Sequence, residues 1–331
     1  MRFMLAERGD RRDLDRLAAA GYVFDLKIDG IRALVTLAGP APRRPSSPSP
    51  SGGSVVGGDD AAEPAVAMTS RNGLDLTGRY PELVEALRQV AAGVSASATP
   101  GDLVLDAEIA VPGADGLPSW PLTHRRTAQR TPAAGQVVEL PAVLYVFDVL
   151  ELAGEDTTGW PLRRRRAALE ELDASWPQRI TLTPTSSEPQ PLWDLVLDHD
   201  LEGVIAKDPA SRYHGGRSRH WVKIKATKTL SCLVGGVEWA PDVPTQPRSM
   251  QLFLVDPDGE LVPCGKASAG VGPALRPALL DGLRRPPLIV EVEYSQITSA
   301  GVLRHPVVRA VRDDIDVLGC STDQLRGATT R

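Results

Sequence analysis

A segment of small residues and prolines at 39–65 limits where this chain can build a hydrophobic core. It is built mainly of Pro, Ser, Gly and Ala, with almost no large apolar side chains. Such a segment cannot bury enough apolar surface to offset the entropy that it would lose on ordering. The preceding residues, 22–37, are rich in β-forming side chains and predict two short strands that meet near Asp29 and Gly30. We therefore predict a disordered insertion within a β-hairpin, with order resuming at 65–73.

The length of the chain favours two domains. It has 331 residues, and single hydrophobic cores rarely grow beyond about 250 residues. Before position 229, apolar periodicity predicts helices and buried strands, with a long loop at 112–140. The predicted helices are 81–92, 161–173 and 191–198, and the predicted strands are 103–111, 142–152, 203–207 and 220–225.

After position 229 the pattern changes to short β-runs with one helical segment. The β-runs are 230–237, 251–256, 260–266 and 288–295, and the helix is 273–284. About five short strands and one helix in roughly 100 residues are typical of a small barrel such as the OB-fold. The sequence therefore predicts an α+β protein, with antiparallel sheets and flanking helices in a first domain at 1–228 and a barrel domain at 229–331.

Composition argues against several classes of protein. No run approaches the roughly 18 apolar residues that a membrane-spanning helix needs, and the first residues of the chain are rich in charge. The three cysteines are spaced too widely for a zinc cluster or a disulfide framework, so we interpret them as reduced thiols of a cytoplasmic protein. The formal net charge of −5 argues against indiscriminate coating of nucleic acid, but it is compatible with a local basic groove.

Lysine is rare in this chain, where arginine is the usual cation. Only six of the 37 basic residues are lysine, and four of the six fall between 207 and 228. A lysine amine can lose its proton and act as a nucleophile, whereas an arginine stays protonated. The clustered lysines therefore indicate a segment that needs more than positive charge. A solvated basic strand or loop is the alternative interpretation.

The segment KIDGIR at 27–32 combines a potential nucleophile, an acid, a glycine turn and an arginine. Its lysine, Lys27, follows an apolar strand, where burial lowers the pKa of an amine and raises its reactivity. By spacing alone, an ordinary strand and turn with mixed charges would also fit. The rest of the chain must decide between the two.

Further motifs follow KIDGIR in a fixed order along the chain. They are SRNG at 70–73, LDAE at 105–108, YVFDVLEL at 145–152, EGVIAK at 202–207, WVKIK at 221–225, GKASAG at 265–270 and LRHPVVRAVRDD at 303–314. This order resembles that of the covalent nucleotidyltransferases, and among them the ATP-dependent DNA ligases of the bacterial end-joining type. The resemblance covers nearly the whole chain apart from the insertion.

The resemblance implies a reaction in three steps, with ATP and Mg²⁺ or Mn²⁺ as cofactors. Lys27 would attack the α-phosphorus of ATP and form a lysyl-adenylate. A 5′-phosphate on broken or nicked duplex DNA would then take the adenylate, and a 3′-hydroxyl would close the strand with loss of AMP. The resemblance further implies a role in DNA repair and recombination through non-homologous end joining, in the cytoplasm and nucleoid of a bacterium. We expect a monomer, a DNA-end-bridging partner and no membrane association.

The resemblance also implies a role for particular residues. The implied ATP-binding residues are Leu26, Lys27, Arg32, Glu108, Phe147, Lys223 and Lys225; the implied metal ligands are Glu108, Glu202 and Asp29; the implied DNA-binding residues are Ser70, Arg71 and Arg32; and the implied motif residues of the OB domain are Lys266, Arg309, Arg312 and Asp314. Lys223 and Lys225 alternate on one strand and so point the same way.

Several of these residues also have simpler interpretations. Phe147 would stack the adenine, although a phenylalanine on a strand is more often part of a core. Glu108 and Glu202 lie beside apolar strands, where salt bridges to arginine would also satisfy them. An exposed turn would explain Arg71, and the run 163–166 is expected to be a solvated helix face.

The motifs depart from the family pattern at three positions. Ala107 stands where the family usually has glycine, Asp25 stands where it commonly has glutamate, and Ile315 replaces a lysine that helps to orient the departing pyrophosphate. Arg309, Arg312 or Lys266 would have to supply that charge. Two alternatives therefore stay open: an RNA ligase or guanylyltransferase of the same superfamily, and a catalytically decayed protein that binds nicks.

Overall fold

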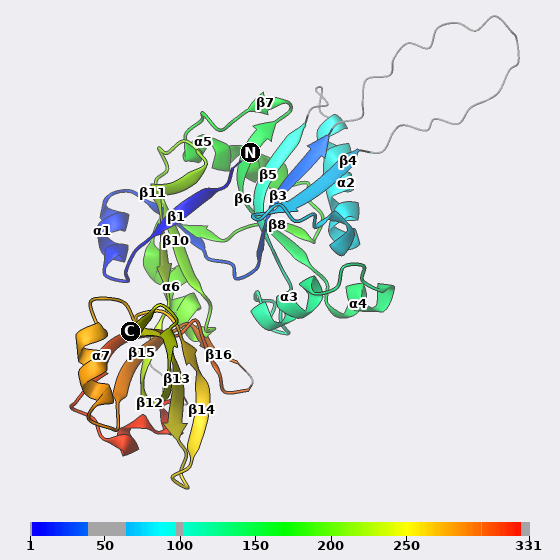
Figure 1. Cartoon of the computed structure of the whole chain (residues 1–331). Helices are drawn as coiled ribbons and strands as arrows, with labels where there is room; N and C mark the ends of the chain where they lie inside the picture. The colour runs from blue at the N-terminus through cyan, green and yellow to red at the C-terminus, as the bar shows by residue number, and fades with distance from the viewer. Residues whose placement is uncertain (1, 39–63, 97–101, 299, 326–331) are drawn as a thin grey trace, which may run out of the picture. The chain divides into compact units, whose positions relative to one another are not determined.

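The computed structural model describes residues 2–38, 64–96, 102–298 and 300–325 (Figure 1). They form two compact units. The first unit comprises Met1–Val196 with Gly203–Ile224, and the second comprises Leu197–Glu202 with Lys225–Arg331. The sequence placed a domain boundary at 228/229, whereas this division falls at 224/225. The predicted insertion at 39–65 lies outside the described residues except for its last two positions.

Two sheets build the first unit. One has five strands in the order β1 (Met4–Arg8), β11 (Gly216–Lys225), β10 (Gly203–Lys207), β2 (Val23–Leu26) and β9 (Thr185–Ser186). The other has the order β4 (Ala65–Ser70), β3 (Ile31–Ala38), β5 (Leu103–Ala110), β6 (Val143–Leu152) and β7 (Glu155–Asp156), with β8 (Ile180–Leu182) beside β6. The two strands predicted within 22–37 are therefore β2 and β3, and they belong to different sheets.

The main core of the first unit lies against the six-stranded sheet. Helix α2 (Pro81–Ala96) contributes Leu83, Leu87 and Val90 to it, at the spacing of one helix face. Helix α5 (Leu162–Asp173) contributes Leu169. The sequence predicted both helices and both strands β5 and β6 to within a few residues. The apolar face of α2 and the apolar runs of β5 and β6 indicated these three elements, and Pro161 with the possible caps before it indicated α5.

The loop predicted at 112–140 is wrong, because this stretch contains two helices, α3 (Trp120–Thr127) and α4 (Ala134–Glu139). Apolar periodicity does not reveal α3, since polar side chains anchor it. The Arg126 guanidinium is fully buried and forms an ion pair of 2.9 Å with Glu82 of α2. The hydroxyl of Thr123 accepts a hydrogen bond of 2.8 Å from the backbone N–H of Val111.

The remaining helices of the first unit are short. They are α1 (Asp13–Ala19), the 3-10 helix η1 (Thr77–Arg79) and α6 (Pro189–Asp198), whose last residues belong to the second unit. None of the helices in the described part of the chain combines the length and the apolar character that a bilayer span requires.

The second unit is an antiparallel sheet with one α-helix. The sheet order is β14 (Leu261–Ala267), β13 (Val243–Val255), β12 (Lys228–Ala240), β15 (Ile289–Tyr294) and β18 (Val307–Arg312). The other elements are the hairpin β16 (Gln296–Ile297) and β17 (Leu303–Arg304), α7 (Arg276–Leu283), η2 (Val317–Cys320) and η3 (Thr322–Leu325). Among the described residues, no ladder joins the edge strands β14 and β18, although a single bridge links Ala269, just after β14, with Val307 of β18. The antiparallel α+β class is therefore confirmed, and a closed barrel is not.

The hairpin of β12 and β13 is longer than the sequence predicted. The pairing of β13 with β14 begins at Met250, so the stretch from Val243 to Ser249 pairs with β12 alone. A proline is tolerated where a strand forms an edge, because its missing N–H breaks no ladder bond there. Pro247, which is opposite Trp239 in the pairing with β12, occupies such an edge.

Candidate active site

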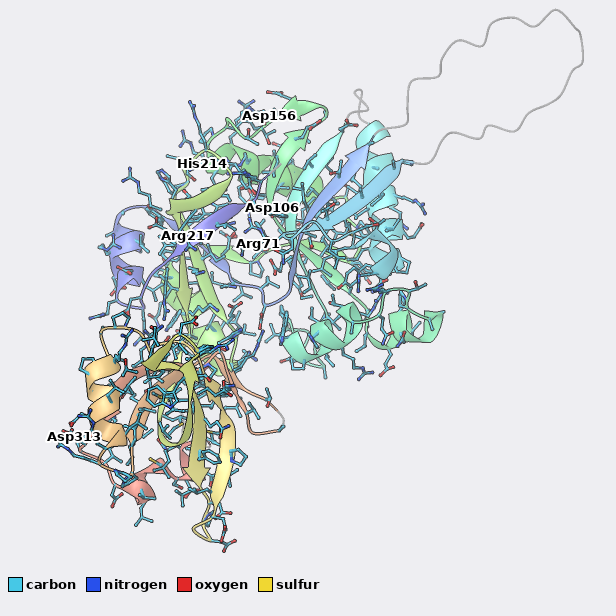
Figure 2. All side chains as sticks on the ribbon, in the orientation of Figure 1. Arg71, Asp106, Asp156, His214, Arg217 and Asp313 are labelled. Carbon is cyan, nitrogen blue, oxygen red and sulfur yellow. The ribbon has the colours of Figure 1, made fainter. Side chains whose placement is uncertain are left out.

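A cavity of about 220 Å³ lies in the first unit and is lined by residues from both of its sheets. Its lining residues are Leu5, Ala6, Asp25, Leu26, Lys27, Ile28, Arg32, Arg71, Glu108, Phe147, Thr183, Ile205, Lys207, Arg217, Trp221 and Lys223. Figure 2 labels Arg71 and Arg217 in the middle of this unit. Seven residues named from the sequence are in the set: Leu26, Lys27, Arg32, Arg71, Glu108, Phe147 and Lys223. We call this space the active-site cavity.

Lys27 lies in the short connection between β2 and β3, and thus between the two sheets. Its backbone N–H donates a hydrogen bond of 2.9 Å to the carbonyl of Gly203. Gly30 lets the chain pass closely against β5, since an added Cβ would lie 2.3 Å from the carbonyl oxygen of Ile109 and 2.9 Å from Cγ of Glu108. The glycine of the KIDG motif is therefore required by the close approach that brings the lysine and Glu108 to one cavity.

Arg32 is fixed by a buried network. Its guanidinium donates two hydrogen bonds, of 2.9 and 2.6 Å, to the carboxylate of Asp106. The hydroxyl of Tyr213 donates a third bond of 2.7 Å to the same carboxylate and accepts one of 2.9 Å from the N–H of Met4. Burial lowers the pKa of Arg32, but Asp106 outweighs burial and raises this pKa above its ordinary value. The arginine is therefore a fixed positive charge.

Aromatic rings surround the cations of the cavity. The Arg32 guanidinium lies 5.2 Å from the ring centroid of Phe147 and 5.7 Å from that of Trp221. The Lys207 ammonium lies 4.6 and 4.3 Å from the same two centroids. Contacts at these distances are favourable cation–π interactions. The two cationic side chains, Arg32 and Lys207, thus hold the Phe147 ring in place.

Sequence reasoning did not include Lys207 among the site residues. Its ammonium forms an ion pair of 2.5 Å with Asp25, and both side chains are almost fully buried. Thr185 donates a hydrogen bond of 2.7 Å to the other oxygen of Asp25. The scarcity of lysine was the available signal, because Lys207 is the last residue of EGVIAK and belongs to the lysine cluster.

The helix face predicted to be solvated at 163–166 is partly wrong. The Arg165 side chain is fully buried and forms hydrogen bonds of 2.6 and 2.9 Å to Asp148, the neighbour of Phe147 on β6. Arg164 instead stacks on Trp160, with its guanidinium 3.5 Å from the ring centroid. A charged side chain is buried here because it is matched by a carboxylate, which a periodicity of apolar residues cannot reveal.

Two cations of the cavity differ from the others. Within the described residues, no side chain or backbone group pairs with the guanidinium of Arg71 or of Arg217. Arg71 lies in the turn after β4, where Ser70 accepts the N–H of Leu74 at 3.0 Å. Arg217 lies on β11. These guanidiniums are available to an anionic ligand.

Four further predicted residues lie outside the lining of the cavity. Ser70 shapes the turn that carries Arg71, and Asp29 lies in the connection after Lys27. Glu202 and Lys225 belong to the second unit and form an ion pair of 2.7 Å with each other. Their predicted roles at the ATP or metal site stay predictions.

The predicted motif residues of the second unit form ion pairs on its sheet. Lys266 pairs with Glu238 at 2.6 Å, and Arg309 donates two hydrogen bonds, of 2.8 and 2.7 Å, to Glu293. Arg312 donates two, of 2.6 and 2.7 Å, to Asp314. A hydrogen bond from Arg312 lowers the pKa of Asp314. Exposed pairs of this kind contribute little stability.

Glu108 is the predicted metal ligand that lines the cavity. No group of three or more His, Cys, Asp or Glu side chains among the described residues is arranged to hold a metal ion. Mg²⁺ is commonly held by one or two carboxylates together with substrate phosphates and water. Glu108 would supply one such carboxylate.

Solved structures share this arrangement of elements. The ligase domain from M. tuberculosis LigD is 25% identical to this chain, with a TM-score of 0.54 and 96% of each chain covered. The structure named Pmar-Lig_PreS3 has a TM-score of 0.67 over 94% of this chain and 67% of its own, at 17% identity, and supports the fold alone. These likenesses define the class, a mixed α/β fold of nucleotidyltransferase-like ligases.

The family follows from the sequence. A model of the ATP dependent DNA ligase domain matches residues 60–225, which is half of the chain. The chain belongs to the ATP-dependent DNA ligase family. A probable DNA ligase of Streptomyces griseus is 32% identical over 269 residues, which cover 72% of this chain and 51% of the relative. A DNA ligase of Thermococcus onnurineus is 28% identical over 279 residues, or 75% and 48%. The chain thus spans about half the length of these curated relatives.

Proposed function

We propose that this chain seals 5′-phosphate and 3′-hydroxyl breaks in duplex DNA, with ATP as the source of a lysyl-AMP intermediate on Lys27. One observation carries the proposal. Side chains from four motifs that are far apart in the sequence line one cavity, together with residues of β10 and β11. The four motifs are KIDGIR, SRNG, LDAE and YVFDVLEL. Membership of the ligase family supports the same chemistry.

In the first step the amine of Lys27 attacks the α-phosphorus of ATP. A nitrogen–phosphorus bond forms, the bond to the β-phosphate oxygen breaks, and pyrophosphate leaves. Only the neutral amine can attack. Lys223 and Arg32 line the same cavity as Lys27. Lys223 also meets the negative charge that develops on the phosphate oxygens.

The base and sugar of the nucleotide have clear candidates. Phe147 would stack the adenine, with its ring fixed by the cations around it. Glu108 would bind the ribose hydroxyls or the metal, and Arg32 would reach the sugar or the nicked strand. The metal, Mg²⁺ or Mn²⁺, would neutralise phosphate charge as a Lewis acid when it is bound. Glu108 would hold it, and for Glu202 and Asp29 we retain the ligand role that the family resemblance implies.

The second and third steps need DNA phosphates at the cavity. Arg71 and Arg217 have guanidiniums without a partner among the described residues. Each can bind a phosphate through two parallel N–H bonds, without reading the base. We propose that they hold the 5′-phosphate end, so that the 3′-hydroxyl can attack in line and release AMP.

For the second unit we propose an OB-fold. Its antiparallel strands, its helix α7 and the segments GKASAG and LRHPVVRAVRDD support this. Lys266, Arg309, Arg312 and Asp314 keep the role in adenylation that the family resemblance implies. Ile315 lacks a charge, so Arg309, Arg312 or Lys266 would assist the departing pyrophosphate. We also propose a monomer that repairs breaks by end joining in a bacterial cytoplasm, with a DNA-end-bridging partner.

The test is transfer of label from ATP to the protein. Purified protein is incubated with α-labelled ATP or GTP and Mg²⁺ or Mn²⁺, and then separated under denaturing conditions. We expect label from ATP only, at Lys27 by mass spectrometry, and none in Lys27→Ala. The matched control is Lys228→Ala, which removes a lysine paired with Asp200 in the second unit and should leave labelling intact. Label from GTP would instead favour a guanylyltransferase.

A sealing assay separates the remaining alternatives. A nicked DNA duplex and its counterpart with RNA strands are offered to the wild-type protein. Sealing of the DNA nick with loss of the product in Lys27→Ala supports the proposal, and sealing of RNA alone favours an RNA ligase. Tight binding to the nick without label or sealing would show a decayed nick-binding protein.

A further inference from the structure

A second cavity lies on the far side of three side chains of the active-site cavity. It has a volume of about 240 Å³ and is lined by Asp25, Phe147 and Lys207, which also line the active-site cavity. Helix α5 supplies its outer wall, including Leu162 and Ala167. We call it the rear cavity. The three shared side chains are the partition between the two cavities.

The partition is made of side chains that hold one another. The Lys207 ammonium pairs with Asp25 at 2.5 Å and lies 4.6 Å from the centroid of Phe147. Thr185 fixes Asp25 from the rear, with a hydrogen bond of 2.7 Å. Lys207 is only 2% exposed. Its long side chain is the part of the partition that a single substitution can remove.

Stability gives little reason for a lysine at this position. A buried ion pair contributes little net stability, because the loss of hydration offsets most of the attraction, and apolar residues of equal volume pack as well. The pair adjoins Phe147, which would stack the base of the nucleotide. The charged Lys207 side chain, held by Asp25, therefore limits how far the active-site cavity extends beyond the base of the nucleotide.

We infer that Lys207 is a specificity-determining residue: held by Asp25, it closes the base end of the active-site cavity and excludes purine nucleotides that carry a large substituent on the base. The inference rests on the proposed function. It assigns the rear cavity as the volume that such a substituent would occupy once Lys207 is removed. The rear cavity, at about 240 Å³, exceeds the roughly 150 Å³ of an apolar protein cavity that binds benzene.

Two double variants test the inference. Asp25→Asn/Lys207→Ala removes the partition, and Asp25→Asn/Lys207→Met removes the same charges but keeps a side chain of similar length. Both spare the acceptor for Thr185, because the amide oxygen introduced at position 25 can still accept its hydrogen bond. The comparison between the two variants therefore separates the effect of the added space from the effect of the lost charge.

The probes are ATP and three analogues with a benzyl group on N6, C2 or C8 of adenine. Intact-protein mass spectrometry identifies the nucleotide attached to Lys27, and calorimetry measures binding of each nucleotide independently of the adduct. In the Ala variant, we expect the affinity for at least one analogue, relative to the affinity for ATP, to rise about tenfold or more. A rise of this size is expected when a pocket gains room for an apolar group. The wild type and the Met variant should reject all three.

A third variant tests the rear cavity itself. Ala167→Phe, added to the Ala variant, places a ring in the rear cavity away from Asp25 and Lys207 and should abolish the gain. An equal gain in the Met variant, no gain in the Ala variant, or a wild type that accepts the analogues as well as ATP would overturn the inference. Failure of wild-type protein to form any adduct with ATP would overturn the proposed function instead, and calorimetry would still decide the role of Lys207.

Discussion

The buried pair of Arg165 and Asp148 gives a sharp prediction about what holds the active-site cavity together. Both side chains are fully buried, and Arg165 also donates to the carbonyl oxygens of Trp160 and Ser211, at 2.5 and 3.2 Å. Arg165→Met would leave the Asp148 carboxylate without its counter-charge. Removing one partner of a buried pair costs about 3–5 kcal/mol. We expect a loss toward the upper end of that range, because the carbonyls of Trp160 and Ser211 also lose a donor.

The loss should depend on pH in a defined direction. Burial already raises the pKa of Asp148, even though Arg165 lowers it. Without Arg165, the pKa in the folded state moves further above the value in the unfolded chain. The folded state then binds more protons than the unfolded state between the two values, so stability falls as the pH rises through that interval, by up to roughly 1.4 kcal/mol per pH unit. The Arg165→Met variant should therefore be less stable at pH 8 than at pH 5.

Urea unfolding followed by tryptophan fluorescence measures the free energy of unfolding. Asp148→Asn/Arg165→Met should be more stable than Arg165→Met at pH 8, because it no longer buries an unpaired charge. The control is Arg285→Met, which breaks the exposed pair of Arg285 and Asp281 and should change stability by less than about 0.5 kcal/mol. A loss below about 1 kcal/mol for Arg165→Met, or a loss that is the same at both pH values, would refute the reasoning.

Three further predictions concern single residues. Gly30→Ala should lower the free energy of unfolding in urea by about 1–3 kcal/mol, because the added Cβ has no room. Gly78→Ala, whose Cβ meets nothing within 4 Å, should change it little. Equal losses in the two variants would contradict the packing argument. Arg217→Ala should weaken binding to nicked duplex DNA and reduce the salt dependence by about one phosphate contact, and an unchanged slope would remove Arg217 from the DNA site. Burial raises the pKa of Cys320 to about 11, so iodoacetamide at pH 8 should alkylate it more than about a hundredfold slower in the folded than in the urea-unfolded protein, as peptide mass spectrometry would show.

The elements that the sequence predicted are those with a strong local pattern. Strand β5 was predicted at 103–111 and spans Leu103–Ala110, because six of its eight residues are apolar and form a run broken only by Asp106 and Glu108. Strand β1 (Met4–Arg8) was missed, since it is only five residues long and is held by pairing with β11, more than two hundred positions away. Such pairing lies beyond the reach of a local pattern.

The candidate active site shows the same difference between what local patterns reveal and what long-range contacts decide. Motifs named the residues that carry chemistry, such as Lys27 and Phe147, and these do line one cavity. Lys207 and Arg217 reach the same cavity only because β10 and β11 are neighbours in the five-stranded sheet. Arg165 supports Phe147 through Asp148, a contact between α5 and β6. Sequence thus predicted the groups that react more readily than the groups that position them.

The choice between lysine and arginine now has a structural meaning. All three lysines of the first unit, Lys27, Lys207 and Lys223, line the active-site cavity. Where this unit needs only to neutralise a buried acid, as at Arg165, it uses arginine, whose planar fork matches a carboxylate. Lys27 must lose a proton, and Lys223 can meet phosphate as a point charge. Lys207 does neither, yet it pairs with Asp25 as a lysine. Its ammonium lies 4.6 and 4.3 Å from the ring centroids of Phe147 and Trp221, and Asp25 holds it there. What distinguishes this lysine is therefore its place in the partition between the two cavities.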